Sequence, residues 1–273
     1  MNYPKDQFEV ILVDSGADRE TQKVIDQYDH PLRNLKVLRP GLGNIGPARA
    51  RNIGLRGAEF EFIAFTDDDC LVPPDWLNLL AEGFTAEPRA AAVGGILSPS
   101  AEKLKNNIFA RYEDWTYRRA RRENKPYHSS VRDELPAYAN NISYRTEIIR
   151  KLGGFSEDFL PFIYGEDGDL KERALNLGYI FYYVPVTVTH LDDYSFKGFW
   201  AKAEKRGAGI LKFRKDHSQR RPSKPEIALR IFISPLIFVF SLKSGSFDFG
   251  LALAKFLAYL GRQSGQIKYY DRV

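Results

Sequence analysis

The stretch "FIAFTDDDCLVPPDW", residues 62–76, ends a buried apolar run in three consecutive aspartates. Asp67, Asp68 and Asp69 are adjacent, and close carboxylates repel one another by roughly 1 kcal/mol or more per pair at intermediate effective dielectric. This repulsion disappears when a divalent cation lies between them. Mg²⁺ and Mn²⁺ take oxygen ligands, usually one or two carboxylates together with phosphate oxygens of a substrate. The stretch therefore predicts a strand leading into a metal site, with a solvated acidic turn as the simpler alternative.

Strand-like and helix-like segments alternate on both sides of this stretch. Strands are predicted at residues 8–14, 35–38, 60–66 and 90–97, and a strand pair interrupted at Pro185 is predicted at 179–190. Helices are predicted at residues 18–28, 47–58, 75–86, 107–124 and 165–178. In the last of these, Leu170, Ala174 and Leu177 share an inward face. The alternation predicts an α/β fold with a largely parallel central sheet and helices on both faces.

Charged side chains stand where the predicted strands end. In sheets of this kind ligands bind at the carboxyl ends of the strands, and Asp14 and the aspartate triplet both follow such ends. Asp167 stands near the start of the helix at 165–178, and His190 ends the segment "VTVTH". Taken singly, Asp167 is explained by the helix dipole, and His190 by an ordinary edge position. Together with Asp14 they predict one metal site, one general base and one acid that binds a nucleoside.

Composition restricts the class of protein. The 273 residues are 44% hydrophobic and 14% aromatic, which is typical of a globular chain with a sizeable core rather than of low-complexity disorder. The single cysteine, Cys70, excludes an intrachain disulfide and a cysteine-based zinc cluster, and it is typical of a reducing compartment. The start "MNYPKDQFEV" lacks the pattern of a signal peptide.

The C-terminal part combines positive charge with apolar runs. Between Lys197 and Pro225 ten Lys or Arg face two acids, a local charge of +8. The runs "IFISPLIFVFSL" (231–242) and "FDFGLALAKFLAYLG" (247–261) follow, and the first is too short to span a bilayer and contains Pro235. Helices lying on an anionic membrane surface are predicted, with a shallow hairpin or a solvated linker before a core helix as alternatives. Nucleic acid is not expected as a partner, because no nucleic-acid fold signature accompanies the charge.

Residues 41–46 read Gly-Leu-Gly-Asn-Ile-Gly, which matches the G-x-G-x-x-G fingerprint of dinucleotide-binding proteins. Asp67 lies 21 residues beyond Gly46, near the place of a ribose-binding acid. An NAD-dependent dehydrogenase is therefore an alternative. It is the weaker one, since a single acid suffices to hold a ribose and a neutral sugar does not compensate three carboxylates.

The order of several motifs resembles that of family 2 glycosyltransferases of the GT-A fold. The resemblance covers roughly residues 3–195 and rests on "FEVILVDSGAD", "GNIGPARARNIGLRGAEFEFIAFTDDDC", "GGFSEDF", "GEDGDLKERALNLGY" and "VPVTVTH". It implies a three-layer α/β/α domain with a Rossmann-like nucleotide-binding half. The family's first βα unit precedes the segment that matches "YPKDQFEVILVD", so we expect the domain to be short at its N-terminus.

The resemblance also implies roles for individual residues. Asp167 would be the catalytic base, and Asp69 and His190 would bind the metal ion, Mg²⁺ or Mn²⁺. The nucleotide-sugar donor would be bound by a further set: Asp14, Asn44, Arg51, Asp67, Asp68 and Glu166.

These expectations combine into one functional hypothesis. Residues 1–195 would form a hexosyltransferase-type domain that transfers a sugar with inversion, by a metal-assisted single displacement, to a hydroxyl of a polysaccharide, lipid-linked or other glycan. Residues 196–273 would form a helical tail that holds the protein at the inner, cytoplasmic face of a membrane. A catalytically inactive relative that serves as a binding module is the second hypothesis.

Overall fold

The computed structural model describes residues 1–15, 18–29, 34–41, 45–119, 127–129, 138–159, 164–241 and 249–272. The chain divides into two compact units. Unit 1 comprises residues 1–96, 122–161 and 166–188, and unit 2 comprises residues 97–121, 162–165 and 189–273. The chain enters unit 2 for the last time at residue 189, near the predicted boundary at 195. The sequence prediction had placed residues 97–121 in the first domain.

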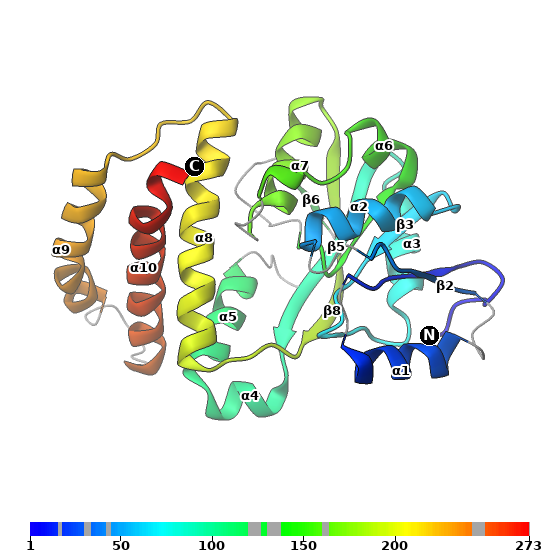
Figure 1. The fold of residues 1–273 in the computed structure, drawn as a ribbon, viewed down its shortest axis with the longest axis horizontal. Helices are drawn as coiled ribbons and strands as arrows, with labels where there is room; N and C mark the ends of the chain where they lie inside the picture. Colours follow the sequence, from blue (N-terminus) through cyan, green and yellow to red (C-terminus); the bar gives the residue numbers. More distant parts are fainter. Residues whose placement is uncertain are drawn as a thin grey trace. The chain divides into compact units, whose positions relative to one another are not determined.

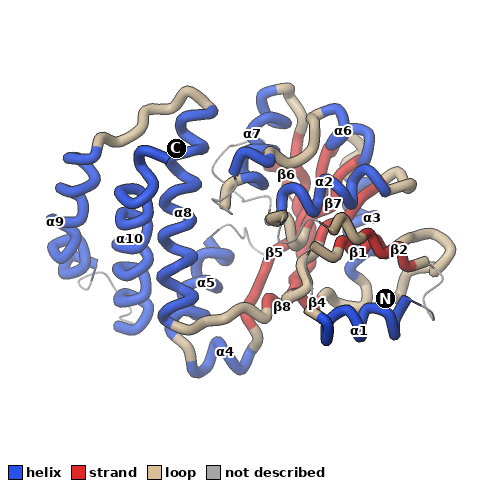
Figure 2. Tube along the Cα trace, viewed as in Figure 1, coloured by secondary structure: helices blue, strands red, loops and turns tan. Residues whose placement is uncertain are grey.

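Unit 1 is built around two sheets (Figures 1 and 2). In the smaller sheet β1 (Val10–Val13) pairs in parallel with β2 (Leu35–Leu38). The larger sheet has the order β3-β7-β5-β8-β4, and β6 pairs with β8. The strands of the larger sheet are β3 (Phe62–Phe65), β4 (Cys70–Leu71), β5 (Ala90–Pro99), β6 (Tyr127–Ser129), β7 (Ile142–Arg145) and β8 (Ile180–His190).

The α/β class is confirmed, but the larger sheet is mixed rather than largely parallel. β7 lies between β3 and β5 and runs antiparallel to both, with Phe62 opposite Arg145 and Ala92 opposite Tyr144. The prediction of parallel pairing holds for β1 with β2 and fails at β7. β6 also runs antiparallel to its neighbour β8, with Tyr127 opposite Tyr183.

Two local predictions are corrected. β8 is one continuous strand of 11 residues rather than a pair, and the exposed Pro185 lies inside it. A proline remains in a strand where no neighbour needs its missing N–H. Leu177 was expected to face inward with Leu170 and Ala174, which are fully buried, but it is 64% exposed. The helix ends one residue earlier, and Leu177 lies in the turn before Gly178, whose φ is 80°.

Helices cover both faces of the larger sheet, as expected. On one face Phe62 of β3 stacks on Phe84 of α3, with ring centroids 4.3 Å apart. On the other face Tyr144 of β7 meets Phe155 edge to face, and α7 covers β8. Hydrophobic burial on both faces therefore holds the strands in a three-layer arrangement. The helices of this unit are α1 (Arg19–Asp29), α2 (Pro47–Gly57), α3 (Trp76–Ala86), α6 (Thr146–Lys151) and α7 (Glu166–Asn176).

Unit 2 is helical in its described residues apart from strand ends. Its helices are α4 (Ala101–Asn106), α5 (Ile108–Arg119), α8 (Phe196–Asp216), α9 (Lys224–Ser241) and α10 (Phe249–Tyr269). α10 lies between α8 and α9 (Figure 1). Glycines allow the backbones of α8 and α10 to approach closely, since a Cβ at Gly207 would lie 2.0 Å from the carbonyl oxygen of Arg262. Among the described residues, no helix combines the length and the hydropathy that crossing a membrane requires.

Candidate functional site

The aspartate triplet forms a turn that joins β3 to β4. β3 ends at Phe65, and the backbone N–H of Cys70 donates to the carbonyl oxygen of Asp67 at 3.2 Å, which closes the turn. The Asp68 side chain is exposed, and Asp69 is half-buried. The turn thus offers carboxylate oxygens, the ligand type that Mg²⁺ and Mn²⁺ prefer, and its residues fit a divalent cation.

Arg51 of α2 connects this turn with the start of α7. Its guanidinium donates to the two carboxylate oxygens of Asp67 at 2.9 and 3.3 Å and to Glu166 at 2.8 Å. Burial by itself would lower the pKa of Arg51, but Asp67 and Glu166 raise it, so the side chain stays charged. With only 12% of the side chain exposed, Arg51 is a buried cation that holds two chain segments in register.

The segment 153–155 packs against Arg51 and its neighbour Asn52. Phe155 lies under the guanidinium, with its ring centroid 5.5 Å from the central carbon of Arg51. Asn52 of α2 accepts from the Phe155 N–H and donates to its carbonyl oxygen, both at 2.8 Å. Arg173 of α7 donates to the carbonyl oxygens of Leu152 and Gly154. Arg51, Asn52 and Arg173 therefore join α2, α7 and the segment between them into one rigid support.

Two adjacent carboxyl groups begin α7, and both have raised pKa values. Burial raises the pKa of Asp167, against the opposing charge of Arg51 and a hydrogen bond from the Gly168 N–H at 2.7 Å. Burial and the neighbouring Asp167 raise the pKa of Glu166 to about 7. A carboxyl whose pKa lies nearer neutrality is a better general base than an ordinary aspartate.

These shifts predict how stability depends on pH. Glu166 binds a proton more readily in the folded chain than in the unfolded chain, where its pKa is about 4.3. Its contribution is therefore fully present at low pH and is lost as the pH rises from about 4.5 through 7. We expect the free energy of unfolding to fall over this window in the wild type and to fall less in Glu166→Gln, whose amide does not titrate. Urea unfolding at several pH values measures the difference, and identical slopes for the two proteins would contradict it.

Asp14 occupies a separate position at the carboxyl end of β1, in the small sheet. Its side chain is only 4% exposed and lies 3.7 Å from the guanidinium of Arg39. Its backbone N–H donates to the carbonyl oxygen of Leu38 at 2.9 Å, which extends the pairing with β2. Asn44 lies outside the described residues. The structure therefore brings together Arg51, Asp67 and Glu166 of the predicted set, with Asp167 beside them.

The sequence prediction missed Tyr144. It is fully buried on β7, and burial followed by the charge of Asp167 raises its pKa. Its hydroxyl oxygen has no hydrogen-bond partner among the described residues. The sequence contained no clear pattern for it, because β7 is four residues long and was not predicted as a strand.

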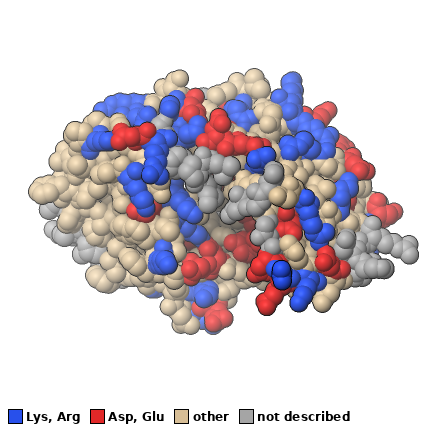
Figure 3. Space-filling view, viewed as in Figure 1, with Lys and Arg blue, Asp and Glu red and all other residues tan. Residues whose placement is uncertain are grey.

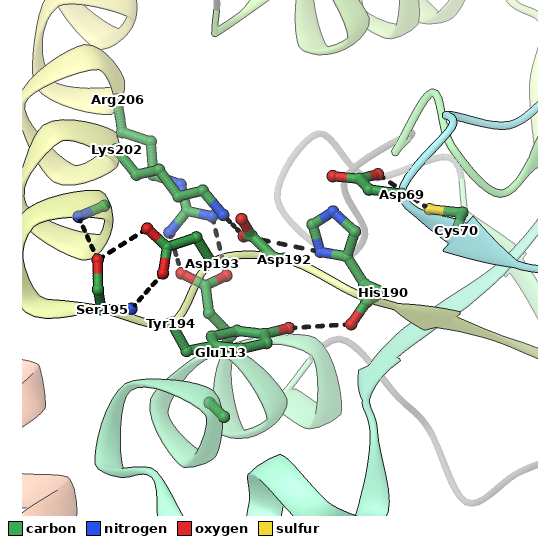
Figure 4. A network of polar contacts seen from close by, with 12 residues as sticks. Asp69, Cys70, Glu113, His190, Asp192, Asp193, Tyr194, Ser195, Lys202 and Arg206 are labelled. Atoms are coloured by element: carbon green, nitrogen blue, oxygen red, sulfur yellow. Dashed lines mark hydrogen bonds and ion pairs between the residues drawn. The ribbon is translucent and has the colours of Figure 1, made fainter. Parts of the chain in front are cut away.

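His190 ends β8 and belongs to a polar network of unit 2 (Figure 4). Its Nδ1 lies 3.9 Å from the carboxylate of Asp192, which also pairs with Lys202 of α8. One helical turn further on, Arg206 holds Glu113 of α5 through two hydrogen bonds of 2.7 and 2.9 Å. Burial opposes the effect of Arg206, but the net result lowers the pKa of Glu113, which stays ionised.

Within unit 1, the Cys70 thiol donates to the carboxylate of Asp69 at 3.6 Å (Figure 4). Burial, together with the charges of Asp69 and Asp67, raises the pKa of Cys70 to about 12. Cys70 is therefore a neutral thiol at physiological pH, which excludes it as a spontaneously ionised nucleophile.

Comparison with known proteins identifies what this arrangement resembles. The family model described as glycosyl transferase family 2 matches residues 1–152. A glucosyl-dolichyl phosphate glucuronosyltransferase of Haloferax volcanii is 26% identical over 166 residues, 61% of this chain and 50% of that protein. A pre-mycofactocin glycosyltransferase of Mycobacterium tuberculosis is 33% identical over 185 residues, 67% of this chain and 37% of that protein. The chain thus spans half or less of the length of these curated relatives.

A solved structure shares the fold. The mannosyltransferase PcManGT of Pyrobaculum calidifontis, in complex with GDP-mannose and Mn²⁺, superposes with a TM-score of 0.63. The alignment covers 98% of this chain and 80% of the other at 19% identity, which establishes similarity of fold.

Proposed function

Because the chain belongs to glycosyl transferase family 2, we propose that it transfers a sugar from a nucleotide-sugar donor to a hydroxyl group of an acceptor. The observation that carries this proposal is the link from Arg51 to Asp67 and Glu166. This link connects the acidic turn, which could hold a metal ion and a diphosphate, with α7, whose first turn contains the candidate base Asp167. The dehydrogenase alternative has no comparable support from the family comparison.

In this proposal Asp167 accepts the proton of the attacking hydroxyl. Its pKa is raised by burial, so its affinity for a proton is closer to what a base working near neutral pH needs. A single displacement with a base on the acceptor side inverts the configuration of the sugar. Tyr144 and Arg51 lie near enough to interact electrostatically with the base, since the charge of Asp167 raises the pKa of Tyr144 and the charge of Arg51 opposes the rise in the pKa of Asp167.

The nucleotide-sugar donor would be bound by a separate set of residues. Asp14 would accept a hydrogen bond from the nucleobase, and Asp67 and Asp68 would contact the ribose and diphosphate. Asn44, Arg51 and Glu166 complete the proposed donor set. Since Arg51 already bonds two carboxylates, its main contribution would be to orient Asp67. Asp69 and His190 would hold Mg²⁺ or Mn²⁺, which stabilises negative charge on a departing nucleoside diphosphate.

Asp69→Asn tests the metal assignment. Loss of one anionic ligand should weaken metal-dependent binding of a nucleoside diphosphate at least about tenfold. Titration calorimetry with Mn²⁺ and with EDTA measures the effect. Asp75→Asn is the matched control, because Asp75 is an exposed acid just beyond the same turn and should not alter affinity. Equal affinity of the Asp69 variant and the wild type, with and without EDTA, would show that Asp69 is not a ligand.

A panel of nucleotide-sugars tests the function itself. Saturation binding in the presence of Mn²⁺ identifies the donor, and the anomeric configuration of the transferred sugar reports inversion. Retention of configuration would exclude the single displacement. Tight donor binding without transfer to any hydroxyl acceptor would favour the second hypothesis, a binding module.

The acceptor is proposed at the level of chemical class. The name of the Haloferax relative describes transfer to a lipid-linked sugar, which supports a lipid-linked or polysaccharide acceptor here. Such an acceptor agrees with a position of the protein at the cytoplasmic face of a membrane, which we propose from the charge of residues 197–225.

A further inference from the structure

The two apolar runs of the C-terminal part are used differently in the structure. The run in α10 fills the interior of unit 2, since Ala254 and Ala258 are 0% and 1% exposed and pack with Tyr112 and Phe199. At Gly261 an added Cβ would lie 2.6 Å from the Cβ of Ala203 in α8. α10 is therefore a structural helix of unit 2, and its exposed large apolar residues, Phe249 and Ile267, lie apart near its two ends.

α9 keeps an apolar face on its outer side. Ile227 and Ser234, seven residues apart, are 0% and 1% exposed and mark the inward side. Leu229, Phe232 and Ile233 occupy positions i, i+3 and i+4, which share one side of a helix, and they are 58%, 82% and 36% exposed. We call these three residues the α9 outer face. A phenylalanine this exposed is unfavourable in water, so the face is suited to contact with an apolar phase.

Positive charge gathers in the stretch of chain that leads into α9. Residues 212–235 contain seven Lys or Arg and two acids, a net charge of +5. Three of these cations are paired, Lys212 with Asp216 at 2.8 Å, Arg220 with Glu226, and Lys224 with Asp271 at 2.7 Å. The remaining positive charge comes from the other Lys and Arg residues of the stretch. In Figure 3 the surface over α9 is mostly uncharged, and Lys and Arg gather near the end where the helix begins. A small apolar face beside a cluster of cations is complementary to a bilayer with anionic headgroups.

We propose that the α9 outer face docks on an anionic lipid surface, with Leu229, Phe232 and Ile233 entering the interface and the neighbouring cations contacting headgroups. This inference narrows the membrane contact from the whole tail to one side of one helix. It does not depend on glycosyl transfer and can be tested without donor or acceptor.

The small apolar area of the α9 outer face favours a lipid surface over a second copy of the chain as its partner. An aromatic side chain buries about 150–250 Å², and the α9 outer face has one aromatic and two aliphatic residues in its described part. The apolar area of these three side chains is therefore small beside the roughly 800 Å² that each partner contributes to a standard protein interface. Partial insertion into a lipid interface has no such minimum area, because headgroup electrostatics adds to it.

The experiment measures sedimentation of the full chain with lipid vesicles. One set of vesicles contains phosphatidylcholine alone, and the other also contains about 30 mol% phosphatidylglycerol, which gives the vesicles a negative surface potential. We expect binding to the anionic vesicles, much weaker binding to the neutral ones, and release as salt increases. Phe232→Asp and Leu229→Asp should each lower the vesicle affinity at least about tenfold. Leu177→Asp is the matched control, because this leucine of unit 1 is 64% exposed, and it should bind as the wild type does.

Two further measurements keep the result unambiguous. Phe232→Trp should bind the anionic vesicles as well as wild type does, and its fluorescence should shift to shorter wavelength on binding. Unchanged circular dichroism and melting temperature would show that the aspartate variants fold. Unaltered vesicle binding of folded Phe232→Asp would overturn the proposal. A dimer in light scattering that Phe232→Asp dissociates, with no vesicle binding by the wild type, would overturn it in favour of a second copy.

Discussion

Asp167→Asn should lower turnover by a factor on the order of 10² or more while donor affinity changes little. A general base acts on the acceptor proton in the transition state, so its removal lowers kcat without weakening the bound donor. The amide keeps the shape of the side chain and can still receive the hydrogen bond of the Gly168 N–H. Turnover therefore reports the lost basicity rather than a change of fold.

The measurement is steady-state transfer together with donor titration, on protein of known donor specificity. Asp158→Asn provides a matched control, because Asp158 is an exposed acid outside the buried cluster, and it should keep full turnover. In the wild type, kcat should fall as the pH drops below the raised pKa of Asp167, since the base is then protonated. Weak donor binding with nearly normal turnover would instead assign Asp167 a structural role.

At a pH well above 7, where Glu166 is ionised, Arg51→Met should destabilise unit 1 by about 3–5 kcal/mol, because it removes one partner of a buried ion pair and leaves the other charged. The uncompensated partner is Glu166, whose side chain is 7% exposed, whereas Asp67 is 36% exposed and remains partly solvated. The raised pKa of Glu166 should rise further, so the destabilisation should be smaller at low pH, where Glu166 is protonated. Urea unfolding at two pH values measures both effects.

A neighbouring arginine provides the control for Arg51. Arg49 lies on the same helix, is 46% exposed and pairs only at 3.9 Å with Glu157, so Arg49→Met should change stability by less than about 1 kcal/mol. The double variant Arg51→Met with Glu166→Leu should recover part of the lost stability, since both buried partners are then apolar. Equal effects of the two single methionine variants would show that the buried link does not stabilise unit 1.

Local patterns were sufficient for most elements that frame the candidate site. The apolar run before the aspartates predicted β3, the proline at 47 predicted the start of α2, and the acidic turn with its glycine stop predicted α7. Each prediction depends on neighbours within about ten residues, where propensity and periodicity act directly. The aspartate triplet and the acidic start of α7 are likewise local patterns, which is why the sequence alone offered Asp67 and Asp167 as candidates.

The relations between these elements required the tertiary structure. Arg51 and Glu166 are 115 residues apart in sequence, and no local pattern indicates that one guanidinium bonds both Glu166 and Asp67. β7 was missed because the strand has only four residues, which is too short for a clear pattern. Its place in the sheet depends on β5 and β3, which lie roughly 50 and 80 residues earlier in the sequence. Leu177 matched a helical period but lies beyond the helix end, since a glycine turn overrides periodicity.

The C-terminal part separates the two kinds of information most clearly. Its charge and its two apolar runs follow from the sequence alone, because composition does not depend on folding. Both runs predict apolar helices, although the second also contains Asp248 and Lys255. Only the packing of α10 between α8 and α9 decides that Ala254 and Ala258 of the second run are buried and that Phe232 and Ile233 of the first are exposed. The sequence determines which residues share one side of a helix. Whether that side is exposed depends on whether another part of the folded chain packs against it.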